Sequence, residues 1–346
     1  MFNLIYKITS PKVVEEFVDV VDNDENSVLV KVEMMAICKA DIRYFLGARD
    51  QNVLNHKYPL APIHEAVGRV IKDPTGHFKK NDKVILVPNS VNENFCIDCP
   101  NKRCERKDLG KNYCPYAEFK SSSSDGFMRE FYASKPEGLV KYNKNVPNEL
   151  AVFSELLSVG VSALRRIDFT NVKRIALFGD GIMAYIVYIV LVNDHPDVEV
   201  TVFGIDQNKL ACFKKAKTTR YEDYRGPKFD TLIECVGGRF SEDAINSMIN
   251  LSLVGADLIL MGVSENNIGV NTRLVLEKGL SLKGVTRSTR EDFIHVSELL
   301  NKKEVLDDLR PMVISVNTVS NISDVYKVFE LDIDNKTIIG KNLMKY

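Results

Sequence analysis

Four side chains that could hold a metal ion come from three distant stretches of the sequence: Cys38, the adjacent pair His64 and Glu65, and Glu155. A thiolate, an imidazole and a carboxylate are ligands of Zn²⁺, and a catalytic zinc keeps one coordination position open for water or substrate. Such a site has no net charge, and it could polarise a carbonyl group or stabilise an alkoxide. Taken singly, Cys38 fits a core thiol and Glu155 a helix-surface acid, so the prediction of a catalytic zinc requires that these residues converge.

Four cysteines lie close together in the irregular stretch 89–120: Cys96, Cys99, Cys104 and Cys114. Structural zinc sites are often closed by four thiolates, and the bound metal stabilises a loop that is too polar to fold alone. The spacing therefore predicts a structural zinc in this loop, and a group of free thiols is the alternative.

A glycine-rich turn, residues 179–184 (GDGIMA), stands between an apolar run and a helical pattern. In such a turn, Gly179 permits the tight bend, Gly181 lets the backbone approach a pyrophosphate, and Ala184 lets the helix pack closely. The N-terminus of the helix then faces the phosphates. The pattern predicts a dinucleotide-binding site, and a turn without a ligand is the alternative.

The end of the next strand decides between NAD and NADP. We place the decisive position at Gly204, which leaves room for a 2′-phosphate and brings no repelling charge, while Lys209 could neutralise that phosphate. Asp206 favours the alternative, because a shift of one or two residues would make it the acid that binds the ribose 2′-hydroxyl of NAD. The sequence favours NADPH.

Two kinds of pattern along the chain predict the elements that must position these residues. Roughly the first 150 residues show short strands and turns, among them Val28–Val32 and Lys83–Val87. Further on, helices alternate with buried strands such as Arg174–Phe178, which predicts an α/β unit with a doubly wound parallel sheet. A helix over Lys209–Lys217 is expected in that unit. Roughly the last 55 residues are too few for a separate domain and should complete the first one.

The composition is that of an ordinary globular chain: 346 residues, 45% hydrophobic and 27% charged, with a formal net charge of −1. This balance argues against nucleic acid or a membrane as partner. The longest apolar run, Ile182–Val192, is much shorter than the ~20 residues of a membrane span, and the N-terminus lacks a secretory signal pattern. We therefore expect a cytoplasmic protein with reduced cysteines.

Several motifs together resemble the zinc-dependent medium-chain dehydrogenases: Cys38-Lys39-Ala40-Asp41, residues 63–68 (IHEAVG), residues 154–160 (SELLSVG) and the glycine turn. A glutamate at 155 instead of a second cysteine is similar to the polyol dehydrogenase branch. The resemblance implies that Cys38, His64 and Glu155 bind the catalytic zinc, with Glu65 beside the metal or exchanging as a ligand. It also implies a GroES-like β-rich catalytic domain (residues 1–152 and 291–346) and a Rossmann domain (residues 153–290).

Longer strings, at 41–50, 234–239 and 271–280, resemble the ribulose-5-phosphate reductases of CDP-ribitol synthesis, which serve teichoic acid and capsule formation. This resemblance implies NADPH-linked reduction of D-ribulose 5-phosphate to D-ribitol 5-phosphate. It further implies a homo-oligomer, either dimer or tetramer, and a ribitol-5-phosphate cytidylyltransferase working with it. The alternatives are an NAD-linked polyol dehydrogenase acting on an unphosphorylated sugar alcohol, and a non-catalytic relative that serves as a binding protein.

A phosphorylated sugar requires cations, and arginine is suited to bind phosphate through two parallel hydrogen bonds. Arg43 and Arg49 follow Cys38 closely in the sequence. Arg287 matches a position where polyol dehydrogenases place an arginine in contact with the substrate. We expect at least one of these three arginines to bind the substrate.

Two residues depart from the family pattern. Ile63 stands where a glycine usually precedes the His-Glu pair, and Ala40 stands where many members carry a serine or threonine that relays a proton. Since alanine cannot relay a proton, the path stays open between metal-bound water, Glu65 and Tyr44.

Overall fold

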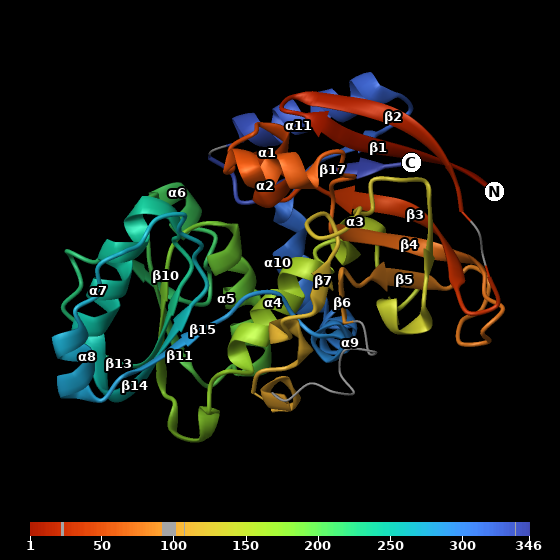
Figure 1. The fold of residues 1–346 in the computed structure, drawn as a ribbon. Helices are drawn as coiled ribbons and strands as arrows, with labels where there is room; N and C mark the ends of the chain where they lie inside the picture. The colour runs from red at the N-terminus through yellow and green to blue at the C-terminus, as the bar shows by residue number, and fades with distance from the viewer. Residues whose placement is uncertain (22–23, 92–101, 107, 336) are drawn as a thin grey trace. The chain divides into compact units, whose positions relative to one another are not determined.

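The computed structural model describes residues 1–21, 24–91, 102–106, 108–335 and 337–346. The chain forms two compact units (Figure 1). The first unit contains residues 1–158 and 288–346, and the second contains residues 159–287.

The first unit is built on a seven-stranded sheet and two antiparallel pairs. The path through the large sheet is β16-β17-β3-β4-β5-β9, with β8 also paired to β3, and the pairs are β1-β2 and β6-β7. Strands from the C-terminal end of the chain thus join strands from its beginning. The strands are β1 (Phe2–Ser10), β2 (Val13–Val20), β3 (Val28–Ala36), β4 (Glu65–Lys72), β5 (Lys83–Leu86), β6 (Asn89–Val91), β7 (Ala117–Phe119), β8 (Phe131–Ser134), β9 (Leu139–Lys141), β16 (Val313–Thr318) and β17 (Lys341–Lys345).

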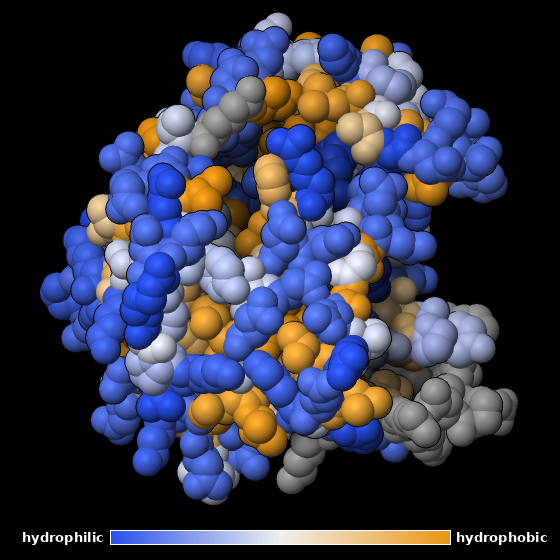
Figure 2. Space-filling model, turned by 90° about the vertical axis from the view of Figure 1, so that its left-hand side faces the viewer, coloured by the Kyte–Doolittle hydropathy of each residue, from blue (hydrophilic) through white to orange (hydrophobic). Residues whose placement is uncertain are grey.

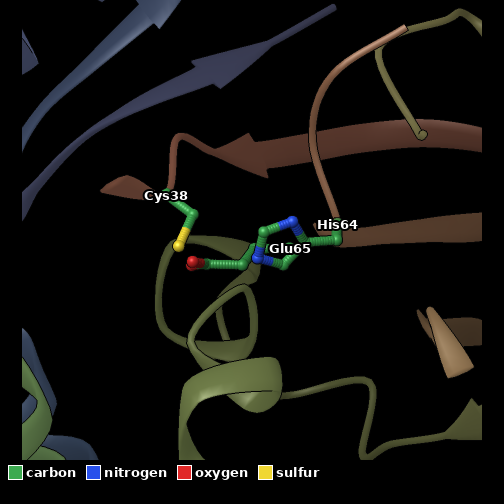
Figure 3. Close-up of side chains that lie close together, drawn as sticks. All are labelled: Cys38, His64 and Glu65. Atoms are coloured by element: carbon green, nitrogen blue, oxygen red, sulfur yellow. The ribbon is translucent and has the colours of Figure 1, made fainter. Parts of the chain in front are cut away.

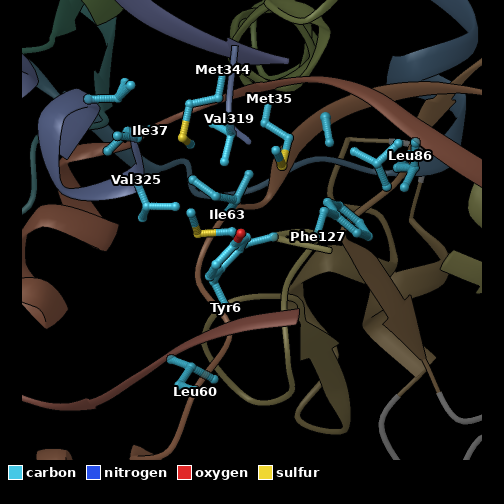
Figure 4. Packing of buried hydrophobic residues seen from close by; sticks show 14 of the residues in the cluster. Tyr6, Met35, Ile37, Leu60, Ile63, Leu86, Phe127, Val319, Val325 and Met344 are labelled. Carbon is cyan, nitrogen blue, oxygen red and sulfur yellow. The ribbon is translucent and has the colours of Figure 1, made fainter. Parts of the chain in front are cut away.

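The helices of the first unit are short, apart from α9 and α11. They are α1 (Lys39–Phe45), α2 (Gln51–Lys57), α3 (Asn148–Ala151), α4 (Ser154–Leu164, which continues into the second unit), α9 (Arg290–Leu299), α10 (Lys303–Leu309) and α11 (Ile322–Asp334). The core joins side chains from the N-terminal strands, the middle of the unit and the C-terminal segment, as Figure 4 shows for Tyr6, Ile63 and Met344. Burial of this apolar surface is the main term that holds the sheet and its helices together.

The second unit is a parallel sheet of six strands in the order β12-β11-β10-β13-β14-β15. In this order the chain starts in the middle and winds outward in both directions, which is the arrangement of dinucleotide-binding folds. The strands are β10 (Arg174–Phe178), β11 (Glu199–Phe203), β12 (Lys217–Thr219), β13 (Phe229–Glu234), β14 (Ser252–Leu260) and β15 (Ser281–Gly284), and the helices are α5 (Ile182–Asp194), α6 (Gln207–Leu210), α7 (Ser241–Leu251) and α8 (Thr272–Lys278). The predicted α/β class, with a β-rich unit and a doubly wound unit, is confirmed.

The predicted helix over Lys209–Lys217 is wrong. α6 ends at Leu210, and tight turns follow that bury Phe213 against Tyr185 and Tyr188, with ring centroids 5.2 Å apart in both pairs. Lys217 then pairs with Thr201 as the start of β12. Burial of one aromatic ring and pairing with the sheet edge outweigh the helical preference of the lysine-rich stretch.

Within the described residues, no helix is both long and apolar enough to cross a membrane. Figure 2 shows mainly hydrophilic side chains on the face in view, with hydrophobic ones scattered between them.

Candidate active site

The antiparallel pairing of β3 and β4 brings the first candidate ligands together. Cys38 follows the end of β3, His64 immediately precedes β4, and Glu65 is the first residue of β4, directly opposite Ala36. One ligand atom from each of Cys38, His64 and Glu65 lies within 4.8 Å of the others. Figure 3 shows the sulfur, the imidazole ring and the carboxylate converging on one point.

Asp41 fixes the two loops that carry these ligands. Its side chain is fully buried; Oδ2 accepts a hydrogen bond from the backbone N–H of Cys38 (3.0 Å) and Oδ1 accepts one from Ile63 (3.0 Å). Asp41 is also the third residue of α1, where a carboxylate satisfies the free N–H groups of a helix start. One carboxylate therefore holds the backbone on both sides of the candidate metal site.

His64 is oriented from the opposite side by Ser121. The imidazole Nδ1 lies 2.6 Å from Ser121 Oγ, and the Phe119 ring packs 4.9 Å from the imidazole between centroids. Because Nδ1 is engaged with a hydroxyl, Nε2 is the nitrogen left for a metal, which is the arrangement that outer partners of a ligand histidine produce. Ser121 is buried and has a φ of 61°, a conformation that costs a serine energy.

The backbone conformation of Ile63 explains why a glycine is usual at this position. Its φ is 78°, a left-handed conformation that is costly for a β-branched residue. Two contacts impose it: the bond from its N–H to Asp41, and the bond that its carbonyl accepts from the N–H of Phe127 (2.7 Å). The side chain is fully buried in the core, and this burial offsets the strain that a glycine would avoid.

Glu65 is held by a lysine from the C-terminal strand. Lys341 donates one hydrogen bond to Glu65 Oε1 and another to the carbonyl oxygen of Ile37 (2.9 Å), and both charged side chains are buried. Burial raises the pKa of Glu65, and Lys341 opposes this shift. Among the described residues, Oε2 of Glu65 has no hydrogen-bond partner.

Glu155 lies outside this group of three, although it is buried in the first turn of α4. Burial raises its pKa to about 8; the positive field of His64 opposes the shift, whereas Glu65 and Cys38 reinforce it. Burial likewise raises the pKa of the Cys38 thiol to about 12, against the effect of Lys341. A divalent cation would replace the protons that both groups hold at neutral pH.

The donor set fits Zn²⁺. It offers one imidazole nitrogen and one carboxylate oxygen from buried residues and one sulfur from the partly buried Cys38, and this mixture is typical of catalytic zinc. Oε2 of the same Glu65 carboxylate has no hydrogen-bond partner among the described residues, and a buried carboxylate oxygen without a donor is costly unless a cation binds it.

The candidate structural zinc site is described only in part. Cys96 and Cys99 lie outside the described residues. Cys104 lies in a short 3₁₀ turn at Lys102–Glu105, and Cys114 is buried just after a second such turn. The prediction of a four-cysteine site stays a prediction.

In the second unit, the glycine turn lies where the pattern predicts, between β10 and α5. Gly179 has a φ of 123°, and a Cβ there would lie 3.2 Å from the carbonyl carbon and oxygen of Cys235. Gly181 precedes the first residue of α5, and a Cβ built on it would meet nothing within 4 Å. Ala184 is fully buried. The backbone at Gly181 is therefore open, while Gly179 is required by the turn itself.

Packing at the end of β11 provides a second reason for a glycine at position 204, besides room for a 2′-phosphate. A Cβ at this position would lie 2.7 Å from Asp180 Cβ and 2.9 Å from Leu210 Cδ2, so close packing alone requires glycine. Asp180 Oδ2 accepts hydrogen bonds from the N–H groups of Ile205 (2.7 Å) and Asp206 (2.8 Å). The absence of a side chain at Gly204 therefore does not by itself indicate a 2′-phosphate.

The charged residues beyond Gly204 are arranged around α6. The Asp206 side chain accepts the N–H groups of Asn208 and Lys209, so it caps this short helix. Arg220, which sequence reasoning missed, is exposed and donates from Nη2 to the carbonyl oxygen of Ile205 (3.2 Å). Lys209 and Arg220 thus bring two cations to the same end of the sheet.

The candidate substrate arginines belong to different parts of the chain. Arg43 lies in α1 and is partly buried; Arg49 follows α1, and its guanidinium lies 5.2 Å above the ring of Tyr44. Arg287 ends the second unit with a φ of 58°, and burial lowers its pKa. Ala40 lies in the first turn of α1 and offers no group for proton transfer.

Sequence reasoning missed three residues that position the metal ligands: Asp41, Ser121 and Lys341. The spacing of Asp41, three residues after Cys38, is a helix-capping signal that could have been recognised. Ser121 contacts His64 across 57 residues and Lys341 contacts Glu65 across 276, and no local pattern announces such contacts.

Comparison with known proteins agrees with this fold. The alcohol dehydrogenase GroES-like domain matches residues 24–144. Ribulose-5-phosphate reductase 1 of Staphylococcus aureus is 35% identical over 100% of this chain and 99% of its own, and ribulose-5-phosphate reductase of Streptococcus pneumoniae is 35% identical over 96% and 95%. The crystal structure of S. aureus TarJ in complex with NADPH superposes with a TM-score of 0.85 at 32% identity, covering 100% of this chain and 99% of that one.

The β-rich unit, the doubly wound unit and the Cys-His-Glu group are those of a medium-chain dehydrogenase, and at this identity over the full length the chain belongs to the ribulose-5-phosphate reductase family of that class of oxidoreductases.

Proposed function

We propose that this protein reduces D-ribulose 5-phosphate to D-ribitol 5-phosphate with NADPH, at a catalytic zinc held by Cys38, His64 and a carboxylate. The observation that carries the proposal is the group of three, in which a thiol, an imidazole and a carboxylate at the ends of two neighbouring strands offer ligand atoms within 4.8 Å of one another. The relatives that are named for this reaction match the chain from end to end.

When bound, zinc polarises a carbonyl oxygen and NADPH supplies a hydride. The chain's own residues hold and orient the reacting groups. Cys38 and His64 supply two ligands, whose directions Asp41 and Ser121 fix. Glu65 and Glu155 are the carboxylates that can complete the site. Ala40 cannot relay a proton, and Glu65 is held as a carboxylate by Lys341, so the proton reaches the substrate oxygen from Tyr44 or from water.

The second unit supplies the cofactor site. The open backbone at Gly181 and the free N–H groups at the start of α5 suit a pyrophosphate, since α5 is a helix of 13 residues and its dipole favours negative charge at this end. Lys209 and Arg220 suit the 2′-phosphate of NADPH. Oδ1 of Asp206 accepts both N–H groups of α6, which leaves Oδ2 for a ribose hydroxyl, so the preference for NADPH depends on Lys209 and Arg220.

The substrate phosphate requires arginine, and we assign this role to Arg43, Arg49 or Arg287. We further propose that the cysteines at 96, 99, 104 and 114 hold a structural zinc, and that the enzyme acts in the cytoplasm as a homo-oligomer. Its product would pass to a ribitol-5-phosphate cytidylyltransferase for CDP-ribitol synthesis.

The proposal is tested by comparing substrates and cofactors on the purified protein. We expect kcat/KM for D-ribulose 5-phosphate to exceed that for D-ribulose by at least about 100-fold, because a buried or bidentate phosphate contact contributes several kcal/mol. We also expect NADPH to be preferred over NADH. Equal kcat/KM for the two sugars would show instead a polyol dehydrogenase for unphosphorylated substrates.

A separate pair of variants tests whether the cations at the end of β11 bind the 2′-phosphate of NADPH. Arg220→Ala should raise the KM for NADPH about tenfold and leave the KM for NADH unchanged, because only NADPH carries the 2′-phosphate. Arg225→Ala removes another exposed arginine, one that bonds to the carbonyls of Glu222 and Tyr224, and should change neither constant.

A further inference from the structure

The buried pair between Lys341 and Glu65 carries an inference about how the site takes up its metal. Both side chains are almost completely excluded from solvent: the exposed fraction is 6% for Lys341 and 0% for Glu65. Burying two charges is costly, and the pair is tolerated only because each neutralises the other and forms good hydrogen bonds. A lysine placed next to three candidate ligands of a divalent cation therefore requires a physical explanation.

Lys341 contacts both segments that carry the ligands. Its ammonium donates to the carbonyl of Ile37, the residue before Cys38, and to Glu65, the residue after His64. The sheet produces this geometry, because β17 pairs with β3 through Leu343 and Ala36, and Ala36 in turn faces Glu65 on β4. The lysine thus comes from the strand next to the two that form the site.

The two oxygens of Glu65 have different surroundings. Oε1 is bound by Lys341, whereas Oε2 is buried and has no hydrogen-bond partner among the described residues. The lysine therefore holds the carboxylate by one oxygen and leaves the other without a donor, and this carboxylate lies beside Cys38 and His64 (Figure 3).

The net charge of the zinc-bound site includes the charge of Lys341. A thiolate and two carboxylates, from Cys38, Glu65 and Glu155, carry three negative charges, and a zinc ion carries two positive ones. The ammonium of Lys341 supplies the third positive charge, so the site with its metal is neutral as a whole. Before a metal binds, Lys341 is the basic side chain hydrogen-bonded to Glu65.

We propose that Lys341 is a positioning residue: it serves as the counter-ion of Glu65 until the metal arrives, keeps the carboxylate in place and thereby limits the zinc affinity of the site. This inference rests on the proposed zinc site and deepens it. Without the lysine, Glu65 loses its counter-charge in the metal-free protein. In the metal-bound protein, zinc still neutralises two of the three negative charges, and the repulsion between the ammonium and the metal ion is removed. The metal-free form is then destabilised more than the zinc form, and by linkage zinc binds more tightly.

The test measures zinc affinity by competition with a chromophoric chelator, together with the melting temperature with and without zinc. Lys341→Met should lower the melting temperature of the metal-free protein and lower the dissociation constant of zinc by at least about tenfold, since removal of one partner leaves a buried charge uncompensated. Lys341→Arg keeps the charge and should stay within about threefold of the wild-type constant. Lys345→Met, at the exposed end of the same strand, should change nothing.

A second variant covers the case in which Lys341→Met does not fold without metal. Lys341→Gln keeps hydrogen-bond donors for Ile37 and Glu65 but removes the charge, and it should tighten zinc binding in the same direction with a smaller loss of stability. A purely structural lysine would destabilise both forms equally, so unchanged or weaker zinc binding in both variants would overturn the inference.

Failure of the proposed site would look different. If the wild-type protein and Cys38→Ser bind the same amount of zinc with the same affinity, the ligand assignment is wrong, and the role of Lys341 is overturned with it. If Cys38→Ser loses one zinc but the Lys341 variants match the wild type, the zinc site stands and only the role of Lys341 is wrong.

Discussion

The metal site and the glycine turn are built in opposite ways. The glycine turn uses six consecutive residues where one strand ends and one helix begins, and its geometry follows from a single positive φ at Gly179. The metal site brings together residues near positions 38, 64, 121 and 341, and it holds two non-glycine residues, Ile63 and Ser121, in left-handed conformations.

This difference has a physical basis. A backbone site for phosphate needs only N–H groups and room, which a short segment can provide. A site for a divalent cation needs several charged or basic side chains at fixed directions, and these must be bound by outer partners from other parts of the fold. The cost in strain and buried charge is met by the large core of the first unit.

The largest effect should come from removal of a ligand in the metal site. Cys38→Ser is expected to lose the catalytic zinc and to lower kcat/KM by at least about 10³-fold, because the polarising charge contributes several kcal/mol. The melting temperature of the metal-free protein should change little. Zinc per chain, measured by elemental analysis, and the rate of NADPH oxidation check both parts; full zinc content with full activity would exclude Cys38 as a ligand.

The pH dependence of zinc binding tests whether Glu155 belongs to the site. Burial raises the pKa of Cys38 to about 12 and that of Glu155 to about 8, so both hold protons at pH 7. Zinc requires both groups ionised, and its affinity therefore falls as the pH falls. If both are ligands, the association constant should rise about 100-fold per pH unit between pH 7 and pH 8 and about tenfold per unit above pH 8.

Chelator competition at a series of pH values measures this slope. A slope of tenfold per unit over the whole range would show that only one of the two groups is deprotonated by zinc. Glu155→Gln should produce that same single-proton slope, and it is the matched control.

The outer partner of His64 should have an intermediate effect. Ser121→Ala removes the hydroxyl that engages Nδ1 and is expected to weaken zinc binding by roughly 10–100-fold. Ser122→Ala, in the same turn, should leave the zinc affinity within twofold or so of the wild type. Equal affinities for the two variants would mean that Asp41, 3.9 Å from Nδ1, orients the imidazole instead.

Two alanine substitutions separate folding from binding in the glycine turn. Gly179→Ala should lower the free energy of unfolding by about 1–2 kcal/mol, because its φ of 123° strains any other residue. Gly181→Ala should leave stability unchanged, since the space above it is open, but it should weaken NADPH binding about tenfold by keeping the pyrophosphate away from the backbone. Unchanged NADPH binding in Gly181→Ala would remove the cofactor from this turn.

The smallest expected difference is between two variants of Ile63, and it measures the backbone strain at that residue. Both Ile63→Ala and Ile63→Gly should destabilise the protein, because the lost core burial of about 2–5 kcal/mol exceeds the strain that is relieved. The glycine variant, which tolerates a φ of 78°, should nevertheless be more stable than the alanine variant by about 1 kcal/mol. Chemical denaturation gives this order, and the reverse order would mean that no strain is stored there.

Sequence patterns predicted most of what is local. Strand β10, the turn after it and helix α5 follow from one apolar run, two glycines and a helical period. The helix expected at Lys209–Lys217 was wrong, because Phe213 in the middle of this segment is buried against Tyr185 and Tyr188. These tyrosines lie far from it in the sequence, so no local pattern predicts the contact.

The metal site could be predicted from the sequence only through the family resemblance, which supplied the convergence of Cys38 with His64 and Glu65. The outer residues could not be predicted, because Ser121 and Lys341 carry no motif and reach the site through sheet pairing and loop packing. Glu155 lies outside the group of three in the structure, so its role as a ligand stays a prediction.

The most direct test of the account is the activity of the protein as zinc is removed and returned. With D-ribulose 5-phosphate and NADPH as substrates, the rate should fall to background when a chelator has removed the catalytic zinc, which is the zinc that the Cys38→Ser variant lacks. The rate should return when zinc is added back. A rate that persists after all zinc has been removed would contradict the proposed chemistry at Cys38, His64 and Glu65.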